Sequence, residues 1–210
     1  MRYHGFDGPE GVAISDGGGF IAIGSPNTGS YYRGEVKVHK YNDAKSSWEQ
    51  IGQTFQGDAN EEYMGVDVSL SQNGRHFALG SLGNQNNLGS VKLSIFCLFD
   101  ALEGSNAEDG FGMNVDLSAT GKILAVGANA YVKVFNCWKD PSDQTNRCNP
   151  REGSFHDFGL RKIALSSDGY TSVVGSPEFD SAKGKVALYG YDDQKKTVES
   201  IDARENEKMV

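Results

Sequence analysis

The sequence is short of basic residues and of long apolar runs, and each shortage excludes a class of protein. Lys and Arg total 20 against 28 Asp and Glu, which gives a formal net charge of -8. Such a balance argues against a phosphate-binding surface, and therefore against nucleic acid as a partner. No run approaches the roughly 18 apolar residues that a membrane-spanning helix needs. The opening MRYHGFDGPEG also lacks the basic and apolar regions of a signal peptide.

Cysteine is scarce, and metal-binding or phosphate-binding motifs are missing. Of three cysteines, Cys137 and Cys148 are close enough in sequence to bridge, whereas Cys97 is interpreted as a small apolar strand residue. Their pairing stays open, because disulfides are rare in reducing compartments. The four histidines have no zinc-like spacing from a cysteine. No glycine-rich phosphate loop opens a helix, so we expect no metal and no cofactor.

Glycine is abundant, and much of it belongs to a phrase that occurs four times. The phrase is a strand ending in a small hydroxyl, a glycine turn and a second strand ending in glycine. Its copies are VAISDGGGFIAIGS, VSLSQNGRHFALGS, VDLSATGKILAVGA and IALSSDGYTSVVGS. A third strand follows each copy, with apolar pairs at Val36/Val38, Val91/Leu93, Val132/Val134 and Val186/Leu188.

The spacing of the copies predicts a β-propeller. The closing glycines Gly24, Gly80, Gly127 and Gly175 stand 56, 47 and 48 residues apart, a period typical of propeller blades. We therefore predict an all-β chain of about four antiparallel blades, at residues 8–57, 63–104, 111–148 and 158–201, followed by a charged tail at 202–210. The first repeat begins close to Met1, so a closed four-blade ring and a fragment of a larger propeller both remain open.

Each predicted strand has a physical reason. In the first strand apolar residues alternate with polar ones such as Asp67, Ser69, Asn114 and Asp116, so we expect one packed and one wet face. In the third strand Lys37, Lys92 and Lys133 are expected to face solvent. A fourth strand is clear only in the first copy, over residues 48–52. The third copy instead carries the polar insert CWKDPSDQTNRCNP.

The serine of each phrase is predicted to stabilise a turn. Glycine at the turns supplies the positive φ that tight hairpins require, and the preceding serine can bond backbone groups of the turn. A catalytic serine would occur once, beside a base. Four equivalent copies therefore indicate a structural role for the turn serines, which are Ser15, Ser71, Ser118 and Ser166.

The segments before the first strands resemble the FG-GAP repeat of integrin-alpha-type β-propellers. The similarity covers about residues 5 to 200. Its FG pairs are Phe111-Gly112 and Phe158-Gly159, with Met64-Gly65 as a substituted copy and Gly8-Pro9 at that place in the first repeat. The resemblance implies a propeller, often extracellular or at the cell surface, that is used for adhesion or ligand recognition.

The chain departs from this family at the loops where many of its repeats hold calcium. Calcium needs six or more oxygen ligands, but the corresponding loops SDGGG, SQNG, SATG and SSDG offer at most one carboxylate each. We therefore expect calcium there to be weak or absent. Acidic residues before the FG pairs are interpreted chiefly as solvated loop charges, with a cation-collecting channel as the alternative; they are Glu61, Glu62, Glu108, Asp109 and Asp157.

The predicted function is recognition of a protein or glycan partner through loops on one propeller face. Loops carry function on such scaffolds, and Tyr31, Tyr32 and Arg33 have the chemistry of binding hot spots. The candidate ligand-binding residues are Tyr31, Tyr32, Arg33, Glu61, Glu62, Asp109 and Asp157. An intracellular scaffold of WD-repeat type is the alternative, although the G-H and W-D pairs are missing. We expect no enzyme, because convergent carboxylates cannot be placed.

Overall fold

The computed structural model describes residues 11–83, 88–95, 98–106, 109–139, 142, 146–151, 155–156, 162–177, 183–194 and 197–200. They form four antiparallel sheets, here called blades 1 to 4, and each sheet is a meander of strands in chain order. Blade 1 contains β1 (Val12–Ile14), β2 (Phe20–Ser25), β3 (Glu35–Asn42) and β4 (Ser47–Gln56), with the short 3-10 turns η1 (Asp16–Gly18) and η2 (Ser30–Tyr32). Blade 2 contains β5 (Val68–Leu70), β6 (His76–Ser81), β7 (Ser90–Ile95) and β8 (Leu98–Glu103).

The two later blades follow the same plan. Blade 3 contains β9 (Asn114–Leu117), β10 (Ile123–Gly127), β11 (Tyr131–Lys139) and β12 (Asn146–Pro150), with β13 (Phe155–His156) also pairing with β11. Blade 4 contains β14 (Lys162–Leu165), β15 (Thr171–Ser176), β16 (Lys185–Asp192) and β17 (Thr197–Ser200). The predicted all-β class and the four antiparallel blades are confirmed. No helix within the described residues is long and apolar enough to cross a membrane.

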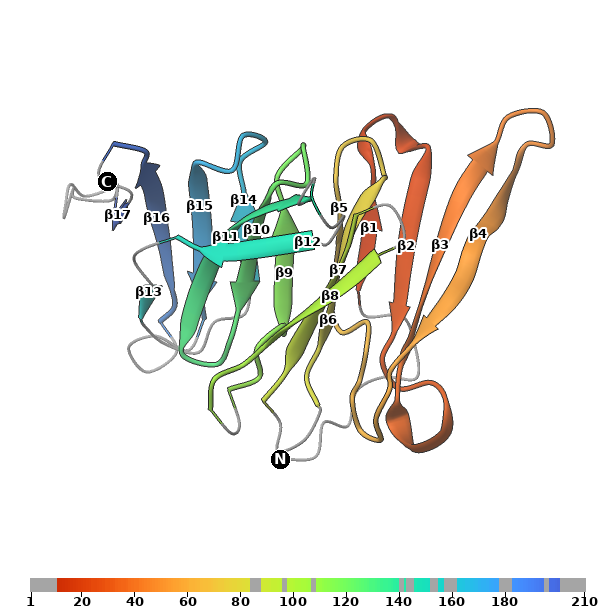
Figure 1. The fold of residues 1–210 in the computed structure, drawn as a ribbon, viewed down its shortest axis with the longest axis horizontal. Coiled ribbons are helices and arrows are strands. Elements are labelled where there is room, and N and C mark those ends of the chain that lie inside the picture. The colour runs from red at the N-terminus through yellow and green to blue at the C-terminus, as the bar shows by residue number, and fades with distance from the viewer. Residues whose placement is uncertain are drawn as a thin grey trace.

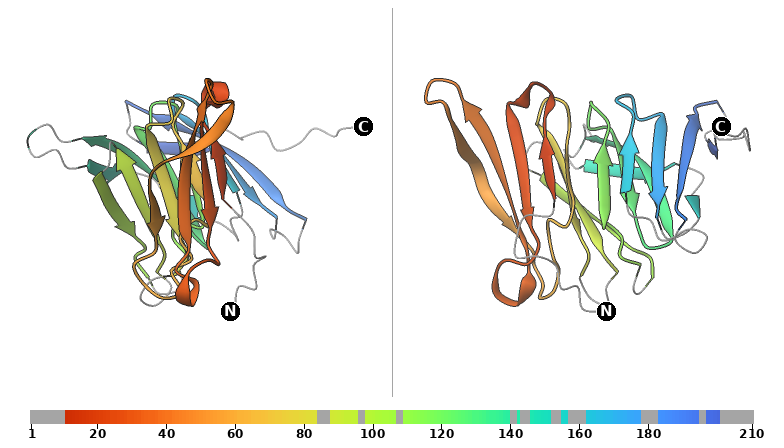
Figure 2. Two further views of the ribbon diagram at one scale, coloured as in Figure 1. Left: turned by 90° about the vertical axis from the view of Figure 1, so that its right-hand side faces the viewer. Right: turned by 180° about the vertical axis from the view of Figure 1, so that it is seen from behind.

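The blades stand side by side in chain order, with blade 1 at one end and blade 4 at the other (Figure 1). Contacts between first strands run from β1 to β5, from β5 to β9 and from β9 to β14. The view from behind in Figure 2 shows the same open fan, in which the end blades do not meet. The blades are therefore propeller-like but do not close into a ring.

The hairpin turns match their prediction. The turn glycines have φ between 67° and 75°, at Gly17, Gly74, Gly121 and Gly169. Each turn serine accepts, through its Oγ, the N–H of the residue that opens the second strand, and the four donors are Phe20, His76, Ile123 and Thr171 at 3.0–3.1 Å. The serines therefore satisfy backbone groups at the turn, and their equivalence is structural.

The apolar core lies between blades, and each blade contributes two different faces to it. We call the face that packs on the following blade the leading face. It carries an alanine of the second strand and the apolar pair of the third strand, as at Ala22, Val36 and Val38. The opposite, trailing face carries the apolar pair of the first strand, as at Val68 and Leu70. The same pairing of faces recurs between blades 2 and 3 and between blades 3 and 4.

The prediction of a wet face on the first strands is wrong. Asp67, Ser69 and Asn114 are buried, because the first strands of neighbouring blades lie against each other. Polar side chains of one strand there accept hydrogen bonds from the backbone of the next. Asp67 Oδ2 accepts Val115 N–H at 3.0 Å and Ser69 Oγ accepts Leu117 N–H at 3.0 Å. These side chains therefore link neighbouring blades through hydrogen bonds.

Asp116 forms the corresponding hydrogen-bonded link to blade 4. Its Oδ2 accepts the N–H of Leu165 at 2.6 Å, and its Oδ1 accepts the hydroxyl of Ser69 at 3.0 Å. Burial raises the pKa of Asp116 above its ordinary 3.8 despite these bonds, and the neighbouring charge of Asp67 adds to the shift. The same cause, burial, raises the pKa of Asp67.

These raised pKa values predict an unusual pH dependence of the free energy of unfolding. A carboxyl whose pKa is higher folded than unfolded contributes stability below pH 3.8, and this stability is lost as pH rises through the folded pKa. An Asp116→Asn variant lacks that loss. Relative to wild type, we expect its free energy of unfolding to improve as pH rises from about 3.8 toward neutrality, as measured by urea unfolding at a series of pH values.

Asp168→Asn serves as the control of opposite sign. Hydrogen bonds from Ser166 and from the N–H of Tyr170 lower the pKa of Asp168. Its carboxylate therefore contributes stability above pH 3.8 that disappears as pH falls through the lowered pKa. Relative to wild type, the free energy of unfolding of the Asp168→Asn variant should therefore decrease as pH rises. Parallel difference curves for the two variants would contradict the interpretation of Asp116.

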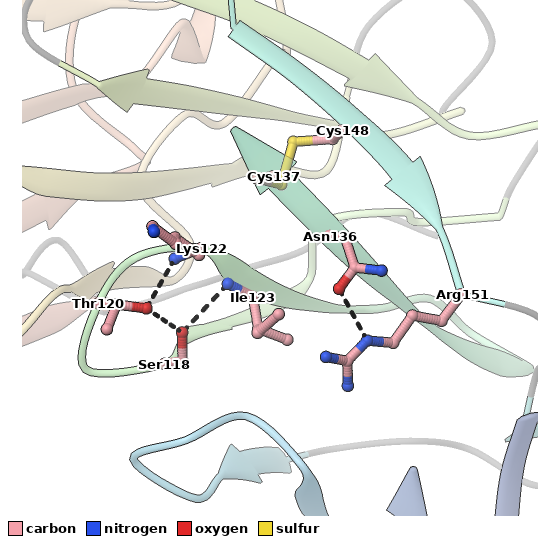
Figure 3. The surroundings of a disulfide bond; sticks show 8 residues. All are labelled: Ser118, Thr120, Lys122, Ile123, Asn136, Cys137, Cys148 and Arg151. Atoms are coloured by element: carbon pink, nitrogen blue, oxygen red, sulfur yellow. Dashed lines mark hydrogen bonds between the residues drawn. A yellow bond between two sulfur atoms is a disulfide. The ribbon is translucent and has the colours of Figure 1, made fainter. Parts of the chain in front are cut away.

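Fourth strands form in all four blades, and the polar insert of the third copy is part of one of them. The sequence interpretation missed β8, β12 and β17, because an outermost strand needs only backbone pairing and carries no strong apolar pattern. The insert pairs β11 with β12, so that Cys137 lies opposite Cys148. The two sulfurs form a disulfide with a Cα–Cα distance of 4.1 Å (Figure 3). Cys97 lies outside the described residues.

Removal of this disulfide is expected to destabilise blade 3. The bridge joins residues 11 apart in sequence, and closing a loop of that size stabilises a protein by about 3 kcal/mol. A Cys137→Ala/Cys148→Ala variant should lose about that much free energy of unfolding in urea titrations. Dithiothreitol should lower the stability of wild type similarly and leave the double variant unchanged. A wild-type chain that alkylates at all three cysteines without reductant would contradict the bridge.

Candidate functional site

The loop between β2 and β3 presents two exposed tyrosines in an uncommon backbone conformation. Tyr31 is 71% exposed and Tyr32 53% exposed. Both are left-handed, with φ of 58° and 56°. This region costs a bulky residue about 1–3 kcal/mol and persists only where the surroundings enforce it. Such strain clusters at functional sites, so the loop is a candidate site on structural as well as chemical grounds.

The segment between β4 and β5 enforces this conformation. The N–H groups of Glu61, Tyr63 and Met64 donate in turn to the carbonyls of Tyr31, Tyr32 and Arg33 at 2.7, 3.0 and 3.0 Å. Glu61 and Tyr63 are also left-handed, with φ of 56° and 53°. The rings of Tyr32 and Tyr63 stack with centroids 5.9 Å apart. We call residues 29–34 and 58–63 together the two-loop surface.

Arg33 adds a positive charge beside a hollow. Its Nε donates to Asn60 Oδ1 at 3.5 Å. Within the described part of the chain Arg33 forms no ion pair. A pocket of about 430 Å³ lies next to it and is lined by Gly29, Ser30, Arg33, Gly34 and Gln56. The two-loop surface therefore offers exposed rings, a cationic donor and a concave polar wall in one place.

Glu62 is not the solvated charge that the sequence suggested, because it is buried. Its carboxylate accepts the N–H of Ala59 at 2.9 Å and lies 3.6 Å from Lys92 Nζ. Lys92 also pairs with Asp58 at 2.6 Å, and its side chain is largely covered rather than facing solvent. Glu62 thus stabilises the base of the two-loop surface from inside. Glu62 therefore lies beneath the loop that carries the tyrosines, and the solvated environment that the sequence suggested for it is wrong.

Asp109 stabilises its own loop instead of joining the two-loop surface. Its Oδ2 accepts the N–H groups of Ser105 and Asn106 and the hydroxyl of Tyr131 at 2.9 Å. Burial opposes its ionisation, but these hydrogen bonds prevail and lower its pKa. Burial and the bond to Asp109 raise the pKa of Tyr131 to about 12. Glu108, Asp157 and the Phe158-Gly159 pair lie outside the described residues.

The structure therefore brings together five of the seven predicted site residues, which are Tyr31, Tyr32, Arg33, Glu61 and Glu62. Sequence reasoning missed Tyr63 and Asn60, which contact Tyr32 and Arg33. The position of Tyr63 beside the Met64-Gly65 pair was the one available signal. Among the described residues no group of three or more His, Cys, Asp or Glu side chains is arranged to hold a metal ion.

Comparison with solved structures finds propeller-like folds. Hydrazine synthase from Kuenenia stuttgartiensis matches 95% of this chain and 52% of its own, with a TM-score of 0.54 and 14% identity. A protein of Bacteroides uniformis assigned as a 6-phosphogluconolactonase matches 92% of this chain and 53% of its own, with a TM-score of 0.61 and 14% identity. TolB from Acinetobacter baumannii matches 93% and 43%, with a TM-score of 0.50 and 16% identity. At such identities the likeness shows the fold alone.

The chain spans about half the length of the solved structures that it matches. No protein-family model matches the sequence, and no curated protein sequence is significantly similar to it. The propeller-like architecture is thus supported by structural likeness, whereas the FG-GAP resemblance rests on the sequence motifs only.

The prediction that the chain is not an enzyme is wrong as an inference from this scaffold. One structural neighbour, the Bacteroides uniformis protein, is assigned as a lactonase. A blade array of this kind is therefore compatible with catalysis, and the sequence argument that convergent carboxylates cannot be placed does not exclude it. Function has to be argued from the site and not from the fold.

Proposed function

We propose that the chain is a recognition module that binds a protein partner through the two-loop surface. The observation that carries the proposal is the rigid display of Tyr31 and Tyr32, exposed at 71% and 53% in left-handed conformations that the neighbouring loop stabilises. Ordering a loop or a side chain on binding costs free energy, and here the backbone of both tyrosines and the ring of Tyr32, stacked on Tyr63, are already held in place.

The chemistry of the surface favours a protein over a glycan. Tyr and Arg are enriched among residues that dominate protein interfaces, and both occur here beside a polar hollow. The resemblance to FG-GAP repeats supports recognition of the adhesion type. The disulfide between Cys137 and Cys148 supports an oxidising compartment, where adhesion modules act. A glycan ligand is the other outcome of the test.

The test is a binding screen with the labelled chain on an array of extracellular protein domains and on a glycan array. Ligands bound by wild type should bind a Tyr31→Ala/Tyr32→Ala variant at least about 30-fold more weakly, since loss of a hot spot costs about 2 kcal/mol or more. Arg33→Ala should weaken them further.

Trp48→Ala is the matched control, because Trp48 is another exposed aromatic residue of blade 1 that lies outside the two-loop surface. Its binding should equal that of wild type. Ligands that bind the tyrosine variant and wild type equally would overturn the proposal. Hits confined to the glycan array would keep the surface and replace the ligand class.

A further inference from the structure

Blade 4 exposes the leading face that every other blade buries. In each blade the closing glycine of the second strand pairs with the first valine of the third, at Gly24/Val36, Gly80/Val91, Gly127/Val132 and Gly175/Val186. Val36, Val91 and Val132 are fully buried against the following blade, whereas Val186 is 67% exposed. Val173, at the position of the buried Ala22, Ala78 and Ala125, is exposed as well.

Blade 1 exposes the trailing face in the same way. Val12 occupies the position of Val68, Val115 and Ile163, as the pairing of the first two strands shows. Those three residues are buried, but Val12 is 56% exposed and its neighbour Ile14 is 61% exposed. The two ends of the fan therefore carry apolar faces built from the residues that form the core elsewhere.

These two free faces are complementary. Each of the three contacts between blades joins a leading face to a trailing face. The one leading face and the one trailing face left uncovered in the described residues belong to blades 4 and 1, at opposite ends of the fan (Figures 1 and 2). Within one copy they do not meet, but blade 4 of one copy can pack on blade 1 of another.

We propose that two copies of this chain close into one ring of eight blades through two such seams, related by a twofold axis. Closed point-group symmetry is the rule for soluble homo-oligomers, and eight blades lie within the usual range for propellers. Closure removes from water the apolar surface that an isolated fan exposes at both ends.

The closing glycine of blade 4 offers a sensitive probe of the seam. A Cβ at Gly24 would lie 2.1 Å from the carbonyl oxygen of Gly65 in the next blade, and a Cβ at Gly80 2.0 Å from that of Gly112. At Gly175 it meets no described atom closer than 3.9 Å. Gly175→Ala should therefore fold normally as one copy but obstruct a partner that packs as the other blades do.

Sedimentation equilibrium of the full chain tests the proposal. Wild type should reach twice its mass of 22.7 kDa at concentrations of order 100 µM. Such a concentration detects even a dimer with a dissociation constant in the micromolar range. Val186→Asp, Val12→Asp and Gly175→Ala should each remain monomeric, with circular dichroism like that of wild type and with no loss of thermal stability at dilutions where wild type is also monomeric. Ile51→Asp, which alters an exposed residue of β4, should dimerise like wild type.

Mixing the variants distinguishes ring closure from non-specific association through exposed apolar residues. Val186→Asp breaks both seams of its own dimer, and so does Val12→Asp. A mixture of the two variants can form one intact seam, from Val186 of one copy to Val12 of the other. The mixture should therefore form a heterodimer that neither variant forms alone. A monomeric wild type, a dimer that survives Val186→Asp, or a mixture without heterodimer would overturn the proposal.

Discussion

Replacement of Gly80 by alanine is expected to prevent folding. The added Cβ would lie 2.0 Å from the carbonyl oxygen of Gly112, inside any real contact distance. Neither backbone can withdraw easily. Gly80 donates its N–H to Asp67 O at 2.9 Å and accepts from Gly65 N at 2.8 Å, and Gly112 donates to Gly127 O at 3.0 Å. We expect a loss of more than about 4 kcal/mol, which approaches the whole stability of a typical domain.

The measurement is soluble yield together with circular dichroism melting, and the chain contains its own control. Gly175 closes the same phrase in blade 4, but its added Cβ meets no described atom closer than 3.9 Å. Gly175→Ala should leave the melting of the diluted chain unchanged, or raise it slightly because alanine is favoured over glycine in a strand by about 0.5–1 kcal/mol. Equal damage at Gly80 and Gly175 would show that the cost arises within the strand and not between blades.

This contrast explains which parts of the fold the sequence could predict. The turn glycines and serines were predictable, because their role is fulfilled within a few residues, as when Ser71 Oγ accepts His76 N–H. The burial of Asp67 and Ser69 was not predictable. It arises because Val115 and Leu117 of the next blade lie beside them, and a period-2 pattern does not report which strands become neighbours. The clash that an added Cβ at Gly80 would make could not be predicted either, because its partner, Gly112, belongs to the next blade.

In the candidate site, too, some features could be predicted from the local sequence and others depend on tertiary contacts. Tyr31, Tyr32 and Arg33 were identified from residue chemistry in one loop. The stacking of Tyr32 on Tyr63 and the left-handed backbone of four residues depend on contact between two loops about thirty residues apart. Glu62 looked like a loop charge because nothing near it in sequence shows that Lys92, from the next blade, lies 3.6 Å from its carboxylate. The chemistry of a site can be read locally, but its rigidity cannot.

Phe111→Ala is expected to cost about 3–5 kcal/mol of the free energy of unfolding, the usual range for a buried phenylalanine. Phe111 is fully buried between blades 2 and 3. Its ring lies 6.3 Å from that of Phe135 and 6.5 Å from that of Tyr131. Truncation would leave a cavity that these rings cannot fill without moving strand β11. Urea unfolding of the purified variant gives the measurement.

Phe111→Met is the matched variant, because Met64 occupies the equivalent place one blade earlier. Met64 is also fully buried, and both residues form the same parallel bridge, Met64 with Gly34 and Phe111 with Gly89. Methionine is flexible and fills irregular gaps, so we expect Phe111→Met to cost less than about 1.5 kcal/mol. That result would make the aromatic of the FG pair a packing residue, for which volume suffices. A loss as large as that of Phe111→Ala would instead show that blade 3 requires the ring itself, and that the substituted blade 2 packs by a different rule.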